Sequence, residues 1–256
     1  MAEKKQKKQF NKEGLDVELG YKQGLERRIH YTLSGKDSSK DLLVFVHGSP
    51  GSSSNFIGFA KDSLLLEKYQ ILLIDRPGFG YSSFGNSEPD MQKQAAILNQ
   101  VVKQFKSKDK ILIGHSLGGP IIVRMAMDTS FNYKGLMLVA ASVSPELEPK
   151  EKWRKPMNWK IIRWLIPRSF RVSNQEILPA KDELEVMEPL WTNITSQVCI
   201  IQGEKDKLVP AGNADYAEKM LVNASKLKVM KFEKFNHFIP FTEPEIMIEE
   251  LLTFFD

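Results

Sequence analysis

The chain has 256 residues, 42% of them apolar and 27% charged, with a formal net charge of +4. Its single cysteine, Cys199, excludes an internal disulfide, and no apolar run approaches the ~18–20 residues of a membrane-spanning helix. The length fits one large α/β domain, and the mild positive charge gives no argument for a nucleic-acid partner.

The N-terminal residues 1–14, MAEKKQKKQFNKEG, are polar and rich in lysine. They lack the apolar core of a secretory signal. We therefore expect a disordered tail on a cytoplasmic protein. A chain from which a secretory or lipoprotein signal had been removed would begin in the same way.

Short apolar segments alternate with helix-length segments along most of the chain. Eight segments are predicted to be strands: Asp16–Lys22, Glu26–Leu33, Leu42–Val46, Ile71–Asp75, Lys110–Gly114, Gly135–Ala140, Gln197–Gln202 and Lys226–Phe232. Runs such as LLVFV and ILLID are typical of parallel strands that are buried on both faces, whereas the first two segments alternate and predict an antiparallel edge hairpin. Four segments are predicted to be helices: Met91–Phe105, Leu117–Thr129, Ala211–Leu221 and Pro244–Phe255. The fold class predicted is α/β, with a doubly wound, mostly parallel, eight-stranded sheet.

One segment interrupts this alternation. Residues 144–191 separate two predicted strands and contain all four tryptophans. A loop of that length without structure is unusual in a compact domain, so an inserted helical cap is expected. The predicted organisation is a core in two parts, 1–143 and 192–256, with the cap at 144–191.

The strongest local motif is Gly114-His115-Ser116-Leu117-Gly118, which lies between a predicted strand and a predicted helix. Glycines two residues before and two after the serine allow the sharp turn that projects its hydroxyl above a sheet. A serine that merely caps the helix is the alternative interpretation.

A serine nucleophile needs a base and an acid that orients the base. By position, His47 and His237 lie in loops that can face Ser116, whereas His30 is expected to be a surface or packing residue. His237 follows the last strand and is the favoured base. Candidates for the acid are Asp206, which we favour, and the alternatives Glu204 and Glu146. Ser116, Asp206 and His237 each come just after a strand, where ligands bind in open parallel sheets.

Acyl transfer also requires hydrogen-bond donors for the oxyanion. Leu117 offers a backbone N–H at the start of the predicted helix. The loop HGSPGSSSN, which follows the strand Leu42–Val46, offers a second donor, and Ser49 is the favoured residue there.

The motifs FVHGSPGSS, LIDRPGFGYS, IGHSLGG, GEKDKLVP and NHFIPFTEP occur in the order and spacing of the α/β-hydrolase family, which the chain resembles from about Gly20 to its C-terminus. The resemblance implies Ser116 as nucleophile, Asp206 as acid, His237 as base, and Ser49 and Leu117 as oxyanion donors. It also implies a lid at the position of the insertion. The turn at residues 114–118 carries Ser116 where haloalkane dehalogenases and epoxide hydrolases of this fold carry an aspartate. Both of these activities are therefore disfavoured. No cofactor and no metal site are expected.

The stretch from Lys150 to Arg171 has eight Lys or Arg residues and one acid, Glu151. Its apolar residues recur at helical spacing, which predicts a lid helix with solvated charges. The composition also allows a lid that handles lipid-like or anionic acyl substrates or makes a peripheral contact with a membrane. The side chains predicted to contact substrate are His47, Trp153, Trp159, Trp164 and Phe238.

The function predicted is hydrolysis of a carboxylic ester, or a similar acyl bond, of a small to lipid-like substrate. The same residues could serve thioester, amide or C–C bond hydrolysis, acyl transfer or perhydrolysis, because a fold does not fix a reaction. A non-catalytic binding protein on the same scaffold is the remaining alternative. The sequence gives no indication of the oligomeric state.

Overall fold

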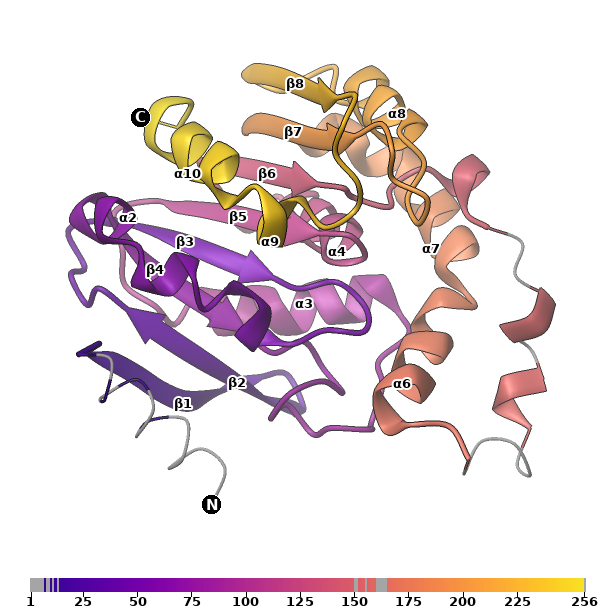
Figure 1. The fold of residues 1–256 in the computed structure, drawn as a ribbon, viewed down its shortest axis with the longest axis horizontal. Coiled ribbons are helices and arrows are strands. Elements are labelled where there is room, and N and C mark those ends of the chain that lie inside the picture. Colours follow the sequence, from indigo (N-terminus) through magenta and orange to yellow (C-terminus); the bar gives the residue numbers. More distant parts are fainter. Residues whose placement is uncertain are drawn as a thin grey trace.

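The computed structural model of the chain describes residues 7, 10, 12, 14–149, 152–154, 156–159 and 165–255. An eight-stranded sheet forms its centre (Figure 1). The strands are β1 (Val17–Gly24), β2 (Arg27–Ser34), β3 (Asp41–Val46), β4 (Tyr69–Ile74), β5 (Lys110–His115), β6 (Gly135–Val139), β7 (Gln197–Gly203) and β8 (Lys226–Phe232). Their order in the sheet is β1-β2-β4-β3-β5-β6-β7-β8. Strand β2 runs antiparallel to both of its neighbours, and all other pairs are parallel. The predicted fold class is therefore confirmed.

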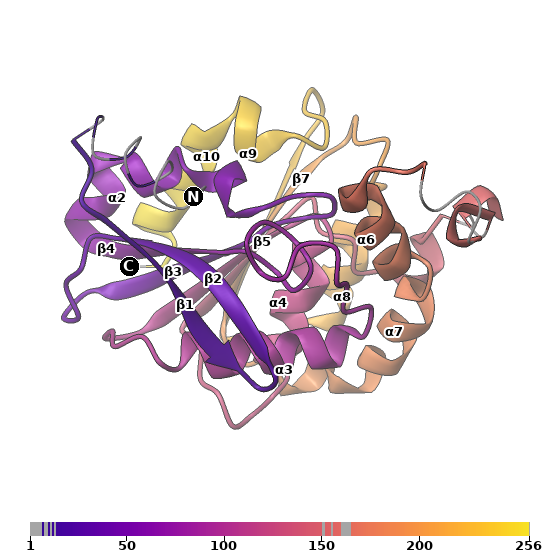
Figure 2. The same cartoon turned by 90° about the horizontal axis from the view of Figure 1, so that it is seen from below.

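Helices cover both faces of the sheet, as Figures 1 and 2 show. One face packs against α3 (Met91–Val102), α4 (Gly118–Ala126), α7 (Ala180–Met187) and α8 (Gly212–Met220). The other packs against α2 (Ser63–Lys68), α9 (Ile239–Thr242) and α10 (Pro244–Thr253). Because both faces are buried, the central strands need apolar side chains on both sides, which explains their continuous apolar runs.

The predicted strands agree with the observed ones to within two residues at either end. The predicted helices are present, although α3 and α4 each end three residues before the predicted limit. Helix α2 was not predicted, since its six residues are too few for a clear apolar period.

The segment between β6 and β7 is helical but differs from the prediction. It contains the helices α6 (Arg168–Ile177) and α7 and the short 3₁₀ turns η3 (Pro145–Leu147), η4 (Lys152–Arg154), η5 (Pro156–Asn158) and η6 (Glu188–Asn193). The prediction of a lid helix over Glu151–Arg171 is wrong for the part that is described. Pro156 begins one 3₁₀ turn and Pro167 precedes α6, because proline lacks the N–H that a helix interior requires.

Of the predicted tail 1–14, only Lys7, Phe10, Lys12 and Gly14 are described. The Phe10 side chain is buried, its carbonyl accepts a hydrogen bond from the Leu15 N–H, and the Lys61 ammonium lies 5.9 Å from its ring centre. Among the described residues, no helix combines the length and the apolar character needed to cross a bilayer.

Candidate active site

Ser116 lies on the sharp turn between β5 and α4. Its φ angle is +55°, a left-handed conformation that costs a non-glycine residue energy and is typical of functional turns. The Ser116 N–H donates to the Val139 carbonyl (3.0 Å), which fixes the turn against β6. A Cβ atom on Gly118 would lie 2.2 Å from the Val46 carbonyl oxygen. The glycine therefore lets the turn sit directly against β3, with the serine at the strand ends.

His237 and Asp206 come from the loops after β8 and β7. His237 Nδ1 lies 2.7 Å from Asp206 Oδ2, and both groups are buried. The other Asp206 oxygen accepts the backbone N–H groups of Leu208 and Val209, each at 2.8 Å. Because an ionised carboxylate only accepts hydrogen bonds, the Nδ1 proton of His237 points at Asp206 and its Nε2 is left as the acceptor.

The carboxylate of Asp206 is held in its charged form. Burial opposes ionisation, but the hydrogen bonds from His237 and from the backbone of Val209 and Leu208 outweigh it, and the pKa of Asp206 lies below its ordinary value. Of the three candidate acids, Asp206 is the one that pairs with His237, whereas Glu204 and Glu146 are exposed.

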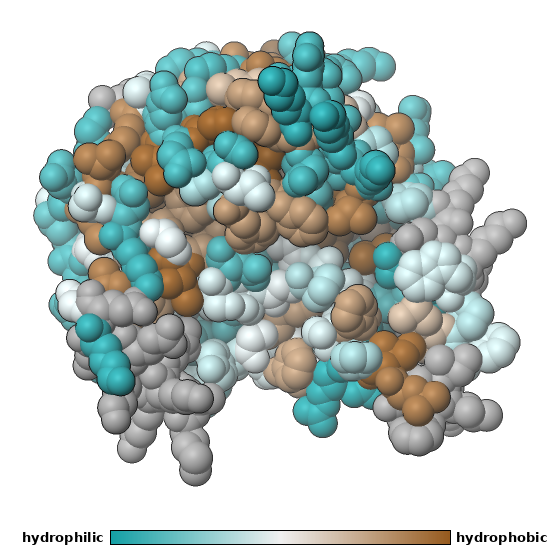
Figure 3. Space-filling view, in the orientation of Figure 1, coloured by the Kyte–Doolittle hydropathy of each residue, from teal (hydrophilic) through white to brown (hydrophobic). Residues whose placement is uncertain are grey.

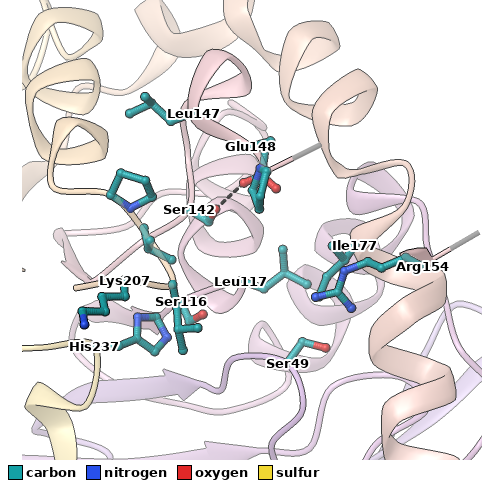
Figure 4. Close-up of a pocket in the computed structure, with 14 residues that line it drawn as sticks. Ser49, Ser116, Leu117, Ser142, Leu147, Glu148, Arg154, Ile177, Lys207 and His237 are labelled. Carbon is teal, nitrogen blue, oxygen red and sulfur yellow. Dashed lines mark hydrogen bonds between the residues drawn. The ribbon is translucent and has the colours of Figure 1, made fainter. Parts of the chain in front are cut away.

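Ser116 and His237 line the same cavity, with a volume of about 270 Å³ (Figure 4). Figure 4 draws the His237 ring beside Ser116 without a hydrogen bond between them. Such contacts are often long without substrate and tighten when it binds. The structure thus brings together the three residues that the sequence placed after separate strands.

The two predicted oxyanion donors are the backbone N–H groups of Ser49 and Leu117. Ser49 and Leu117 line the same cavity as Ser116, and among the hydrogen bonds of the described residues neither N–H has an acceptor. A Cβ atom on Gly48 would lie 2.8 Å from Ser116 Cβ, so the glycine allows this close approach of the loop. The arrangement fits an oxyanion-binding pair.

His47, a predicted substrate contact, is engaged with the backbone on both sides of its ring. Its Nδ1 lies 2.7 Å from the Gly48 carbonyl, and its Nε2 accepts the Arg76 N–H at 3.0 Å. Burial, together with the Arg76 charge, lowers the pKa of His47 to about 3. The ring is therefore neutral and holds the loop, with its edge on the wall of a second cavity.

His115 has a role that the sequence did not reveal. Its Nε2 lies 2.9 Å from the carbonyl of His237, and the two rings lie 4.8 Å apart. Burial, with the nearby His237, lowers the pKa of His115 to about 4. The neutral ring can therefore donate to that carbonyl and fix the backbone that carries His237.

The second cavity, of about 310 Å³, opens at the same serine and is aromatic. It shares Ser49, Ser116, Leu208 and His237 with the first cavity. Its aromatic side chains are Phe56, Phe170, Phe238 and Phe241. Among its described lining residues there is no Lys, Arg, Asp or Glu, whereas Arg154, Lys207 and Glu148 line the first cavity.

Of the remaining predicted substrate contacts, one lines a cavity at Ser116 and two do not. Phe238 lines the second cavity and is half exposed. Trp153 and Trp159 are 56% and 64% exposed and line neither cavity. Trp164 lies outside the described residues. Within the described ranges, no group of three or more His, Cys, Asp or Glu residues could hold a metal ion.

Residues 41–160 match the family model of the alpha/beta hydrolase fold. A proline iminopeptidase of Saccharolobus solfataricus is 30% identical over 145 residues, which are 55% of this chain and 46% of the relative. Protein phosphatase methylesterase 1 of Candida albicans is 28% identical over 206 residues, 71% of this chain and 55% of the relative. The chain thus spans about half the length of these curated relatives.

A solved esterase from Exiguobacterium antarcticum superimposes with a TM-score of 0.70 at 21% identity, covering 92% of this chain and 98% of the esterase. That likeness concerns the fold. It agrees with the strand order and with the matched segment, which contains the loop after β3 and the turn after β5. On these grounds the chain is a protein of the α/β-hydrolase fold.

Proposed function

We propose that the protein is a serine hydrolase that cleaves carboxylic esters through an acyl-enzyme on Ser116. The observation that carries the proposal is the 2.7 Å contact between His237 and Asp206, beside the cavity that Ser116 lines. In the neutral imidazole, a hydrogen bond from Nδ1 to the carboxylate leaves Nε2 as the acceptor, placed to take the proton of a serine hydroxyl.

In the proposed reaction, Ser116 Oγ attacks the ester carbonyl carbon while His237 Nε2 takes the hydroxyl proton. The carbonyl oxygen becomes an oxyanion and accepts hydrogen bonds from the N–H groups of Ser49 and Leu117. The C–O bond to the alcohol then breaks, and His237 returns the proton to the leaving oxygen. Water, deprotonated by the same histidine, attacks the acyl-enzyme; the bond to Ser116 Oγ breaks, His237 returns the proton to Oγ, and the acid is released. Asp206 stays ionised throughout and keeps the imidazole in its orientation.

The aromatic cavity supports a substrate with an apolar acyl group. Its wall carries phenylalanine rings and no formally charged residue among those described, so an acyl chain there would exchange water for apolar contacts. Each methylene buried contributes about 0.8 kcal/mol, which corresponds to roughly a fourfold gain in kcat/KM. The proposed substrates are therefore esters of medium to long acids.

The charged residues of the first cavity, the one of about 270 Å³, favour a substrate with a polar leaving group. Arg154 and Lys207 line this cavity, and Glu148, the one acid among its described lining residues, accepts a hydrogen bond from Ser142. Two cations against one acid disfavour a substrate that carries a free N-terminal ammonium group. This balance argues for an ester rather than for the peptidase activity that the name of the iminopeptidase relatives states.

The residues at the rim of the site are evidence for a lipid-like substrate and for a peripheral contact with a membrane. Leu208 and Phe238 are exposed beside Lys205, Lys207 and Lys234, around a third hollow of about 370 Å³. Figure 3 shows apolar and polar atoms mixed around the depression between the strand ends and the α6 segment. We predict that the protein sediments with anionic phospholipid vesicles at low salt and is released by added salt. Recovery of all the protein in the supernatant at low salt would count against the contact.

An ester panel tests the proposed function directly. We expect kcat/KM for p-nitrophenyl esters to rise from acetyl to octanoyl, and Ser116→Ala to be inactive on all of them. Phe238→Ala should flatten the dependence on chain length. Leu25→Ala provides the control, because Leu25 is a similarly exposed apolar residue in the distant hairpin. Activity restricted to acetyl esters would refute the apolar acyl group, and cleavage of a prolyl anilide alone would favour a peptidase.

A further inference from the structure

A charged pair lies buried between the core and the segment that joins β6 to β7. Arg76 follows β4 and Glu176 belongs to α6, and their side chains are 0% and 1% exposed. The guanidinium binds the carboxylate through two bonds, Nη1–Oε1 at 3.0 Å and Nη2–Oε2 at 3.1 Å. Charges removed from water are costly unless they are paired and hydrogen-bonded in this way, so moving α6 from the core would leave Arg76 and Glu176 without each other.

Arg76 also holds the loop that carries the predicted oxyanion donor. Its Nε donates to the carbonyl of His47 (2.8 Å) and its Nη2 donates to the carbonyl of Gly48 (3.1 Å). Its Nη1 donates to the side-chain oxygen of Gln94. Its backbone N–H binds the His47 ring at 3.0 Å. A single guanidinium thus fixes two consecutive peptide carbonyls.

Holding the Gly48 carbonyl determines where the next N–H points. The two groups belong to one trans peptide, in which C=O and N–H point in opposite directions. Since the Gly48 oxygen faces Arg76 and the His47 ring, the Ser49 N–H is directed away from them. That N–H has no acceptor among the described residues, and Ser49 lines the cavity of Ser116.

Glu176 also contacts Ser49, through the Ser49 side chain. Ser49 Oγ donates to Glu176 Oε2 at 3.0 Å, and Figure 4 draws the Ser49 side chain directed toward the helix of Ile177. The other oxygen accepts Gln94 Nε2 at 3.0 Å. Burial raises the pKa of Glu176, and the Arg76 charge and these hydrogen bonds oppose that rise.

We propose that Glu176 is a positioning residue that couples α6 to the oxyanion site by holding Arg76 and Ser49. When α6 is seated, the carboxylate fixes the Gly48–Ser49 peptide with its N–H toward the reacting carbonyl. When α6 moves away, Arg76 loses its partner and the donor loses its orientation. The inference rests on the proposed function, because it assigns a role in stabilising the oxyanion at Ser116.

The test uses Glu176→Gln, Glu176→Asp and Ser49→Ala in the full chain, with kcat normalised to the sites that a fluorophosphonate labels. Glu185→Gln is the control, because Glu185 is an exposed carboxylate on the neighbouring helix α7. We expect Glu176→Gln to lower kcat about tenfold or more with KM within twofold, since donors to an oxyanion act in the transition state. The affinity for a boronic acid, which forms a tetrahedral adduct on serine, should fall by a similar factor, and Glu176→Asp should recover part of both losses.

Unchanged kcat and boronic acid affinity in Glu176→Gln would overturn the inference, as would a loss confined to KM. If Glu176→Gln does not fold, Ser49→Ala decides, because it removes the hydrogen bond to Glu176 and leaves the ion pair intact. A normal kcat in Ser49→Ala would then overturn the inference. A wild-type protein that forms no adduct at Ser116 overturns the proposed function and the inference together, whereas an active wild type with unaffected variants overturns the inference alone.

Discussion

The molecule contains two buried histidine–aspartate pairs with similar geometry in different surroundings. His237 Nδ1 lies 2.7 Å from Asp206 Oδ2, and His30 Nδ1 lies 2.9 Å from Asp75 Oδ2. Burial opposes ionisation of both aspartates, but hydrogen bonds from the histidine and from backbone N–H groups hold each pKa below its ordinary value. The geometry of the pair therefore does not distinguish them.

The second ring nitrogen separates the two pairs. In His237 it is left to face the cavity that Ser116 lines. In His30 it is buried and has no hydrogen-bond partner among the described residues, and the ring packs between Tyr21 and Tyr81 at 5.2 and 4.8 Å. The expectation of a surface position for His30 is thus wrong, while the expectation of a packing role is correct.

The two aspartates also differ in the segments whose N–H groups donate hydrogen bonds to them. Asp75 accepts the backbone N–H groups of Ser53 and Tyr81, so it joins two loops to β2. Among the described residues, the Asp206 carboxylate accepts hydrogen bonds only from its own loop and from His237. A histidine–aspartate pair becomes a candidate for catalysis when its free nitrogen meets a nucleophile and oxyanion donors at an open cavity.

The largest difference between the pairs is expected for Asp206→Asn. The amide would reverse the hydrogen bond and stabilise the wrong tautomer of His237, and we expect kcat to fall by about 10⁴-fold. Ester turnover with the octanoyl substrate measures this, and circular dichroism checks that the variant is folded. A kcat within tenfold of the wild type would show that Asp206 does not orient the base.

The next effect concerns the approach of the loop to Ser116. Gly48→Ala would place a Cβ 2.8 Å from Ser116 Cβ, and the resulting displacement should lower kcat/KM by roughly 100-fold. Gly58→Ala is the matched control, because nothing lies within 4 Å of a Cβ there. Equal kcat/KM for the two variants would exclude a tight contact between the loop and the serine.

His30→Phe tests the role of the buried His30–Asp75 pair. The substitution removes a hydrogen bond to a buried carboxylate, which should lower the free energy of unfolding by about 2–3 kcal/mol. Activity per labelled serine should stay within about threefold of the wild type, since His30 lines neither cavity at Ser116. Urea unfolding and active-site titration measure the two quantities. A loss of kcat as large as in Asp206→Asn would assign the second pair a catalytic role.

The smallest effect is a pH dependence of stability that arises from His115, beside the His237–Asp206 pair. His115 has a folded-state pKa of about 4, below the ordinary value of 6.5, so between these values the unfolded chain binds a proton that the folded chain does not. The free energy of unfolding therefore falls as pH decreases from about 6.5, by about 1–2 kcal/mol at pH 5 from this residue. Urea unfolding of wild type and His115→Phe measures it. The variant should show a shallower slope, and identical slopes would contradict the low pKa.

The fold and the positions of Ser116, Asp206 and His237 after their strands could be predicted because their signals are local. Strands buried on both faces give continuous apolar runs, and Ser116, Asp206 and His237 lie in loops that follow such runs. The glycines around Ser116 mark a turn in which a side chain would clash.

The contacts between Arg76 and Glu176 could not be predicted, because 100 residues separate them and charged side chains are usually exposed. The hydrogen bond of His115 could not be predicted for a similar reason, since its acceptor is a backbone carbonyl 122 residues away. In the tryptophan-rich segment, helical spacing was outweighed by Pro156 and Pro167.

The central claim is that the pair at His237, and not the pair at His30, activates Ser116. Intact-protein mass spectrometry after exposure to a fluorophosphonate tests it most directly. We predict one adduct per chain, mapped to the Ser116 peptide, absent in Ser116→Ala, strongly slowed in Asp206→Asn and formed at a normal rate in His30→Phe. No adduct on the wild type, or an equal rate in Asp206→Asn and the wild type, would contradict the account.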